Sequence, residues 1–250
     1  CIRDRGKIIG SAAGFALGGP LGAIVGGAAG HAVDKIHPKE KLPEEKAVKQ
    51  IGFTIGVIVL SAKMAKADGK VTKNEVIAFR KKINVPNHEI KNVGRLWDQA
   101  KQTTNGFEIY AKQIADLLEV KSPVLEELLN LLLFIAKADG KISEGEILYL
   151  KQVSIIFGFS ENHFGRVYRT NVENNLNPYE ILGVSKEEST EEIRDKWKKL
   201  VINHHPDKLL AQGMPIDFIK TSTSRLQEIN HAWDIIKNRE NKHDTPPNNY

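Results

Sequence analysis

A seven-residue pattern recurs in the middle of the chain and limits the folds that this segment can adopt. Lys66–Thr72 reads Lys-Ala-Asp-Gly-Lys-Val-Thr, and Lys137–Ser143 reads Lys-Ala-Asp-Gly-Lys-Ile-Ser. Each copy follows an apolar stretch with helical periodicity, over residues 51–65 and 124–136. The glycine in each copy can supply the positive φ that ends a helix. The repeat therefore predicts two similar helical halves that pack on each other.

Each copy of the repeat also ends in a signal for the start of a second helix. Thr72 precedes Glu75 by three residues, and Ser143 precedes Glu146 by three residues. In such a capping box the hydroxyl accepts from an amide of the first turn, and the glutamate accepts from the cap amide. No run of alternating apolar and polar residues is long enough for a strand. We therefore expect an all-α protein, with a two-half helical bundle over residues 50–171.

The tripeptide His205-Pro206-Asp207 connects two further segments with helical periodicity. The first segment starts at Ser189, three residues before Glu192, which is again a capping box. Its apolar face is formed by Ile193, Trp197, Leu200 and His204. Its basic face is formed by Arg194, Lys196, Lys198 and Lys199. The second segment places Leu226, Ile229, Trp233 and Ile236 on one side. We expect an antiparallel helical hairpin, with the tripeptide stiffened by its proline at the connecting tip.

This C-terminal segment resembles a J-domain. The segments that carry the resemblance are Asn177–Val184, Ile193–Leu200, His205–Lys208 and Gln227–Trp233, with Trp197 and Trp233 at positions where tyrosine is common. The resemblance covers about residues 177–240 within an expected domain at 174–240, followed by a flexible tail at 241–250.

The J-domain resemblance implies a DnaK-type chaperone as partner and stimulation of its ATP hydrolysis. The residues expected to contact that partner are His205, Pro206, Asp207, Arg194, Lys198 and Lys199. A basic helix would speed and orient the encounter with an acidic surface. The plainer alternative is that the basic residues form a solvated face and the tripeptide an ordinary turn.

The repeated segment resembles the TerB-like domain of tellurite-resistance proteins, an all-helical fold of two similar halves. Some members of that family are thought to bind metal, which would implicate Asp68, Glu75, Asp139 and Glu146 as ligands of a divalent cation. Each loop has a single aspartate, so neither follows a calcium-loop pattern. The default expectation is therefore that the Asp-Gly pairs end helices, that the glutamates close capping boxes, and that the domain is an interaction scaffold without a cofactor, with metal binding as the alternative.

Residues 1–34 are rich in glycine and alanine, and the 23 residues from Ile8 to Gly30 contain no charge. Glycine recurs at every fourth position, and the candidate helix-pairing stripe comprises Gly10, Gly14, Gly18, Gly22, Gly26 and Gly30. This length would span a hydrocarbon core of about 30 Å. The expectation is a membrane helix that also forms a homodimer, and the alternative is a flexible leader. A charged linker, residues 35–49, follows.

The order of the three segments is similar to that of the bacterial DnaJ-like protein A (DjlA) family. That resemblance implies an inner-membrane anchor with the bulk of the chain in the cytoplasm, a wholly cytoplasmic location being the alternative. Lysines and arginines are more numerous after the glycine-rich segment than before it, which favours the same orientation.

The remaining sequence features argue against several classes of function. We find no nucleophile–base pair, phosphate loop or zinc-helix motif, so we expect no enzymatic activity. The net charge of +5 is spread along the chain, and we expect no nucleic-acid binding. The only cysteine, Cys1, cannot form an internal disulfide, and we expect the natural start of the chain to be lost or atypical. The two functions that remain are a J-domain co-chaperone and, as the alternative, a TerB-type metal- or stress-responsive binding protein.

Overall fold

The computed structural model describes residues 44–67, 72–82, 90–102, 104–172 and 177–243. These residues form helices and no strands, which confirms the all-α prediction. The first group of helices, called here the middle domain, comprises α3 (Glu44–Met64), α4 (Lys73–Lys82), α5 (Ile90–Ala100), α6 (Phe107–Leu118), α7 (Pro123–Ala136), the short 3-10 helix η1 (Lys137–Asp139), α8 (Glu144–Ile156) and α9 (Glu161–Val172).

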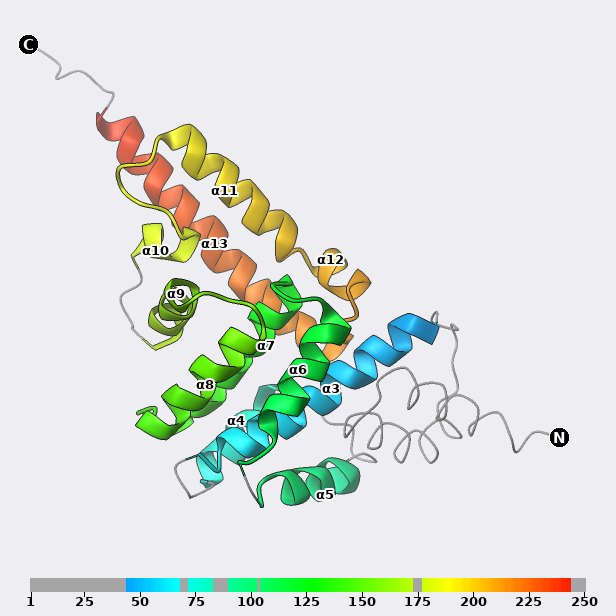
Figure 1. Cartoon of the computed structure of the whole chain (residues 1–250). Coiled ribbons are helices and arrows are strands. Elements are labelled where there is room, and N and C mark those ends of the chain that lie inside the picture. Colours follow the sequence, from blue (N-terminus) through cyan, green and yellow to red (C-terminus); the bar gives the residue numbers. More distant parts are fainter. Residues whose placement is uncertain (1–43, 68–71, 83–89, 103, 173–176, 244–250) are drawn as a thin grey trace, which may run out of the picture.

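The second group, called here the C-terminal domain, comprises α10 (Pro178–Leu182), α11 (Thr190–Asn203), α12 (Pro206–Ala211) and α13 (Ile216–His243). In Figure 1, α11 and α13 lie side by side as a hairpin, and α12 occupies the connection between them. The N-terminal end of α13 reaches into the middle domain, while its C-terminal end projects away from it.

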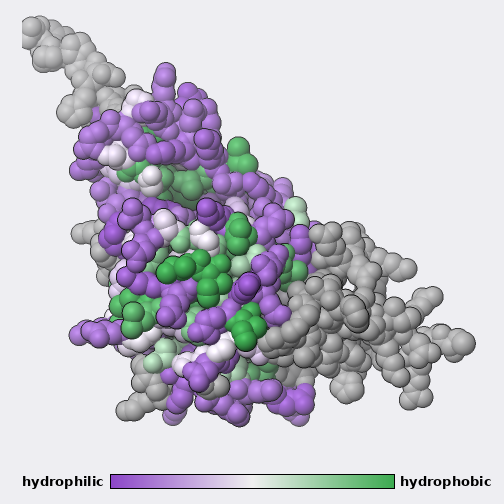
Figure 2. Space-filling view, viewed as in Figure 1, coloured by the Kyte–Doolittle hydropathy of each residue, from purple (hydrophilic) through white to green (hydrophobic). Residues whose placement is uncertain are grey.

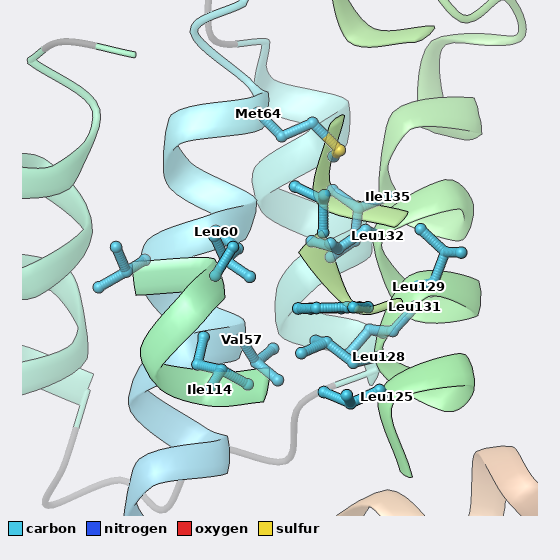
Figure 3. Packing of buried hydrophobic residues seen from close by; sticks show 14 of the residues in the cluster. Val57, Leu60, Met64, Ile114, Leu125, Leu128, Leu129, Leu131, Leu132 and Ile135 are labelled. Carbon is cyan, nitrogen blue, oxygen red and sulfur yellow. The ribbon is translucent and has the colours of Figure 1, made fainter. Parts of the chain in front are cut away.

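The centre of the middle domain is the contact between α3 and α7 (Figure 3). α7 also packs against α4, α8 and α9, so it has neighbours on nearly every side. A helix with such surroundings is largely apolar, which agrees with the run of leucines in its sequence, and its buried polar residues Glu126, Glu127 and Asn130 bind partners on neighbouring helices. The buried residues shown in Figure 3 include Val57, Leu60, Met64, Ile114, Leu125, Leu128, Leu129, Leu131, Leu132 and Ile135.

Two glycines allow α6 to approach α3 closely. A Cβ atom at Gly52 would overlap the side chain of Leu117, and a Cβ atom at Gly56 would overlap that of Ile114. The spacing of four residues places both glycines on one face of α3. This close approach lets the side chains of α6 enter the core directly beside the α3 backbone.

The predicted helix signals are present where the structure describes them. Ser143 and Glu146 form a complete capping box at α8, and Ser189 and Glu192 form another at α11. Gly140 has a φ of 87° at the end of η1, as a terminating glycine requires. These local signals therefore set the boundaries of the helices that carry the candidate site.

Some boundaries differ from the expected ones. α3 begins at Glu44, so the last six residues of the expected linker, 44–49, are helical. α13 continues to His243, three residues into the expected tail. The glycine-rich segment, residues 1–34, lies outside the described residues.

The described residues contain two hydrophobic clusters, and α13 contributes to both. The smaller cluster is the core of the C-terminal hairpin: Ile181, Leu182, Ile193, Ile229, Ala232, Trp233 and Ile236. The larger cluster is the core of the middle domain, yet it also includes Leu209, Met214 and Phe218. The N-terminal end of α13 and the connection before it are therefore part of the middle-domain core.

Candidate functional site

The His-Pro-Asp loop lies at the junction of α11 and α12, and its geometry is set by the start of α12. His205 is the N-cap of this helix and Pro206 is its first residue. The backbone N–H of Asp207 donates to Nδ1 of His205 at 3.3 Å. A proline at the first helical position has a φ already suited to the helix. The loop is thus a pre-organised helix start; the sequence predicted the tip stiffened by proline but not the short helix α12 that follows it.

The polar side chains of this loop remain available to a partner. The side chains of His205 and Asp207 are 51% and 87% exposed. Because Nδ1 of His205 accepts a hydrogen bond, the neutral ring carries its proton on Nε2. Lys208 is instead held by Asn203, whose Oδ1 accepts from Nζ at 2.6 Å. The loop therefore presents one imidazole N–H and one exposed carboxylate within three consecutive residues, with Oδ2 of Asp207 at 3.7 Å from Nδ1 of His205.

The predicted basic face lies on α11, next to the loop. Arg194, Lys198 and Lys199 are all exposed on this helix. Lys198 has Asp195 at 3.4 Å, and Lys196 is paired with Glu188 at 2.7 Å. Exposed pairs of this kind contribute little energy and exchange readily for a partner's carboxylates. Figure 2 shows mainly hydrophilic side chains over the part of the molecule that contains α11 and the C-terminal half of α13.

Two tryptophans fix the angle between the helices of the hairpin. The rings of Trp197 and Trp233 are stacked, with centroids 5.3 Å apart. The indole N–H of Trp197 donates to Oδ1 of Asn230 at 3.0 Å. A stacked aromatic pair with a satisfied polar atom is both apolar and directional. These contacts hold the basic face of α11 in a constant position relative to α13.

His204 does not belong to the core of the hairpin, although its spacing from Leu200 placed it on the apolar face. It is the C-cap of α11, and its side chain is 2% exposed and turned to the middle domain. There its Nδ1 lies 2.9 Å from Oε1 of Glu127 on α7. Sequence analysis missed this pair because 77 residues separate its members. The available signal was the pair of adjacent glutamates in the otherwise apolar helix α7.

The adjacent carboxylate on α7, Glu126, is bound within the middle domain. Its oxygens lie 3.3 Å from Arg166 and 3.4 Å from His163, both on α9. Burial alone would raise the pKa of Glu126, but the hydrogen bond from His163 and the charges of Arg166, His204 and His163 hold it below its ordinary value. Glu126 therefore remains ionised at neutral pH and secures α9 to α7.

Three of the four predicted metal ligands lie in the described residues, and Asp68 lies outside them. Glu75 accepts from the amide and hydroxyl of Thr72, at 2.7 and 3.0 Å. Glu146 accepts from the amide and hydroxyl of Ser143, at 2.8 and 2.9 Å. Both glutamates thus serve their capping boxes.

The fold also brings these acidic residues near one another. Burial raises the pKa of Glu75 to about 7, and the negative charges of Glu146 and Asp139 add to this effect, while the hydrogen bonds from Thr72 oppose it. Among the described residues, no group of three or more His, Cys, Asp or Glu side chains is placed to hold a metal ion. Metal binding that includes Asp68 stays a prediction.

Glu75 should make the stability of the protein depend on pH. The pKa of Glu75 is about 7 in the folded chain, above the ordinary value of 4.5, so the folded state binds this proton more tightly than the unfolded state does. Glu75 therefore lowers the stability of the protein as the pH rises from 4.5 to about 7. Glu75→Gln keeps an acceptor for the capping box and removes the titration. We therefore compare the free energy of unfolding of Glu75→Gln with that of the unmodified chain. The difference should grow in favour of Glu75→Gln between pH 4.5 and 8, by up to about 3 kcal/mol.

Denaturant unfolding at a series of pH values measures this difference. Glu144→Gln, at an exposed position on the first turn of α8, is the matched control and should show no comparable trend. A difference between Glu75→Gln and the unmodified chain that stays constant across the pH range would contradict the prediction.

Three family models match consecutive parts of the chain. Residues 5–51 match the co-chaperone DjlA transmembrane domain, residues 54–169 match the tellurite resistance protein TerB, and residues 177–244 match the DnaJ domain. The DnaJ match includes α10 to α13, so the C-terminal domain is a J-domain. The TerB match includes α4 to α8 with parts of α3 and α9, so the middle domain is called the TerB domain below. Within the helices that the structure describes, none combines the length and hydrophobicity needed to cross a membrane. The predicted glycine stripe lies outside these helices.

Curated relatives are similar to the chain over most of its length. The co-chaperone protein DjlA of Coxiella burnetii is 26% identical, with 93% of this chain and 96% of the relative covered. The protein of the same name from Photobacterium profundum is 24% identical, with 93% and 97% covered. That from Vibrio cholerae is 25% identical, with 77% and 79% covered. No solved structure matches the chain significantly. The resemblance to DjlA-type co-chaperones is thereby confirmed, with the DjlA transmembrane, TerB and DnaJ domains in that order along the chain.

Proposed function

We propose that this protein stimulates ATP hydrolysis by a DnaK-type chaperone and recruits that chaperone to a membrane or to a specific client. The observation that carries the proposal is the His-Pro-Asp loop, in which His205 and Asp207 are exposed on a loop held by helix capping. The similarity to proteins named co-chaperone DjlA supports the same role. The protein itself performs no chemistry in this proposal, because the partner carries out the hydrolysis.

The basic face and the loop have separate roles in the proposed encounter. Arg194, Lys198 and Lys199 attract an acidic surface of the ATPase and orient it before contact. His205 and Asp207 then engage the docked partner, the first as an N–H donor and the second as an acceptor for an arginine. Because Pro206 and the capping bond pre-set the loop, little conformational entropy is lost on binding.

Replacing His205 tests the loop. We expect His205→Gln to lower the maximal stimulation of the chaperone's ATPase rate by about tenfold or more, the equivalent of roughly 1.4 kcal/mol or more at one contact. The assay follows phosphate release by a DnaK-type chaperone at increasing concentrations of the full chain in mild detergent. His231→Gln, at an exposed histidine on α13 of the same domain, should leave the stimulation unchanged. Full stimulation by His205→Gln at unchanged helicity would disprove the role of the loop.

Reversing charge on α11 tests the basic face. We expect Arg194→Glu with Lys198→Glu to raise the concentration needed for half-maximal stimulation and to weaken its dependence on salt. The reason is that exposed charges are screened within about 10 Å at 0.1 M salt. The control pair, Lys91→Glu with Arg95→Glu, makes the same charge change at two exposed residues of α5 in the TerB domain. If both pairs have equal effects at every salt concentration, the stimulation depends on net charge alone, and a specific role of the basic face of α11 is excluded.

We infer further that the glycine-rich segment anchors the protein in the bacterial inner membrane, with the TerB and J-domains in the cytoplasm. The match of residues 5–51 to the DjlA transmembrane domain supports the anchor. The excess of lysine and arginine after the segment supports the orientation. Glycine at every fourth position would let two such helices approach closely, so we also propose a homodimer through this segment.

Membrane fractionation tests the anchor. The full chain should sediment with membranes and resist extraction by high salt, and deletion of residues 1–34 should release it. Substituting leucine at Gly14, Gly18 and Gly22 should abolish self-association by forcing the helices apart, while added hydrophobicity preserves insertion. Recovery of the full chain in the salt-extracted fraction would disprove the membrane anchor, and the proposal for the J-domain would be unaffected.

A further inference from the structure

The J-domain is anchored to the TerB domain beside the His-Pro-Asp loop. Leu209, Met214 and Phe218 are at most 3% exposed, and they belong to the same buried cluster as Phe53 of α3. The rings of Phe53 and Phe218 meet edge to face, with centroids 4.7 Å apart. Gly213 lies so close to α3 that a Cβ atom there would overlap the side chain of Lys49. The segment after the loop is thus inserted into the other domain.

A buried polar pair fixes the segment before the loop. The side chains of His204 and Glu127 are 2% and 1% exposed, and Nδ1 lies 2.9 Å from Oε1. The second oxygen of Glu127 has no partner among the described residues, so this hydrogen bond is the one that satisfies the carboxylate there. Removing one member of such a pair leaves a buried polar group without a partner, which is costly. His204 is therefore held firmly, and it is joined by one peptide bond to His205.

A third contact prevents the J-domain from pivoting about the first two. Arg169 on α9 donates to Glu180 on α10 at 3.2 Å. Arg166 of the same helix lies against Gly183, at 3.4 Å from the position of a Cβ atom. The exposed ion pair adds little stability by itself. Together with the apolar contact and the buried pair, it gives three separated points of attachment, which define a single orientation.

Docking in this orientation leaves the partner-binding residues accessible. His205 and Asp207 are exposed, and so are Arg194, Lys198 and Lys199 on α11. An inhibitory docking would instead cover the loop or the basic face. The TerB domain therefore contacts the residues on either side of the loop and leaves the loop itself exposed.

We propose that the TerB domain positions the J-domain, and that Glu127 is a positioning residue which acts through His204 on the His-Pro-Asp loop. This inference rests on the proposed co-chaperone function and deepens it. The directional bond to Glu127 fixes the end of α11, and the apolar contacts fix α12 and the start of α13. The four residues between His204 and Leu209 then have little freedom. Loss of the bond frees the loop and lowers the fraction of molecules with the productive loop geometry.

The experiment compares two buried hydrogen bonds in the full chain. Glu127→Ala removes the bond to the J-domain, whereas the control Tyr149→Phe removes the bond from the Tyr149 hydroxyl to the carbonyl of Leu60, which lies within the TerB domain. Both substitutions should lower the thermal unfolding midpoint. We expect only Glu127→Ala to lower the maximal ATPase stimulation, by about tenfold, as loss of a buried hydrogen bond implies. Equal losses in both variants would show a merely structural role and overturn the proposal.

Two further variants test the mechanism. Glu127→Gln keeps an acceptor for the imidazole N–H and should restore most of the stimulation. The double variant Glu127→Ala with His204→Ala should be no worse than the poorer single variant, because both remove the same interaction. Unimpaired or increased stimulation by Glu127→Ala would refute the positioning role, and additive losses in the double variant would refute the coupling.

Hydrogen exchange of the full chain, without any chaperone, separates this proposal from the proposed function. In Glu127→Ala, amide exchange over residues 204–212 should accelerate, while exchange over the hairpin core at 229–236 should stay unchanged. Unchanged exchange at 204–212 would overturn the anchoring. If the unmodified chain fails to stimulate a DnaK-type chaperone while exchange responds as expected, the co-chaperone function fails and the anchoring by Glu127 stands.

Discussion

Two hydrophobic cores share the helix α13, and the position of the His-Pro-Asp loop depends on this sharing. α13 has 28 residues, so it is about 42 Å long. Phe218, near its start, packs with Phe53 in the TerB domain, whereas Ile229, Trp233 and Ile236 pack in the J-domain. A continuous helix has little freedom to bend between two packed ends. The two domains therefore meet at one orientation, and the loop that precedes α13 is held at their junction.

The apolar contact and the polar pair contribute different properties to this junction. Burial of Leu209, Met214 and Phe218 favours docking, but the hydrophobic effect has no directional preference. The bond between His204 and Glu127 is directional, and a shifted arrangement would leave both groups buried without partners. Glu126 performs the same task within the TerB domain, where it binds α9 to α7. The two adjacent glutamates on α7 thus set the positions of two different neighbours.

This arrangement explains how an exposed loop can be both accessible and well defined. Short loops at the tip of a hairpin are usually the mobile part of a domain. Here the loop begins beside a buried histidine and continues into a helix whose Leu209 is fully buried in the other domain. The residues that contact a partner are exposed, while those on either side are not. The partner ATPase in our proposal would therefore bind a loop whose position is set by contacts within both domains. This binding would take place at the membrane to which the N-terminal segment is expected to attach the chain.

Local sequence determined the helical class, the capping boxes at Ser143 and Ser189 and the two helices of the hairpin. Each of these depends on side chains within four residues of one another, so spacing alone reveals them. Tertiary structure decided the environment of His204, which periodicity had assigned to the hairpin core, and it brought Glu127 and Phe53 to the loop. It also decided that Glu75 is buried near other acidic groups, which raises its pKa. These features join residues far apart in the chain, and only the packing of the helices determines which distant side chains meet.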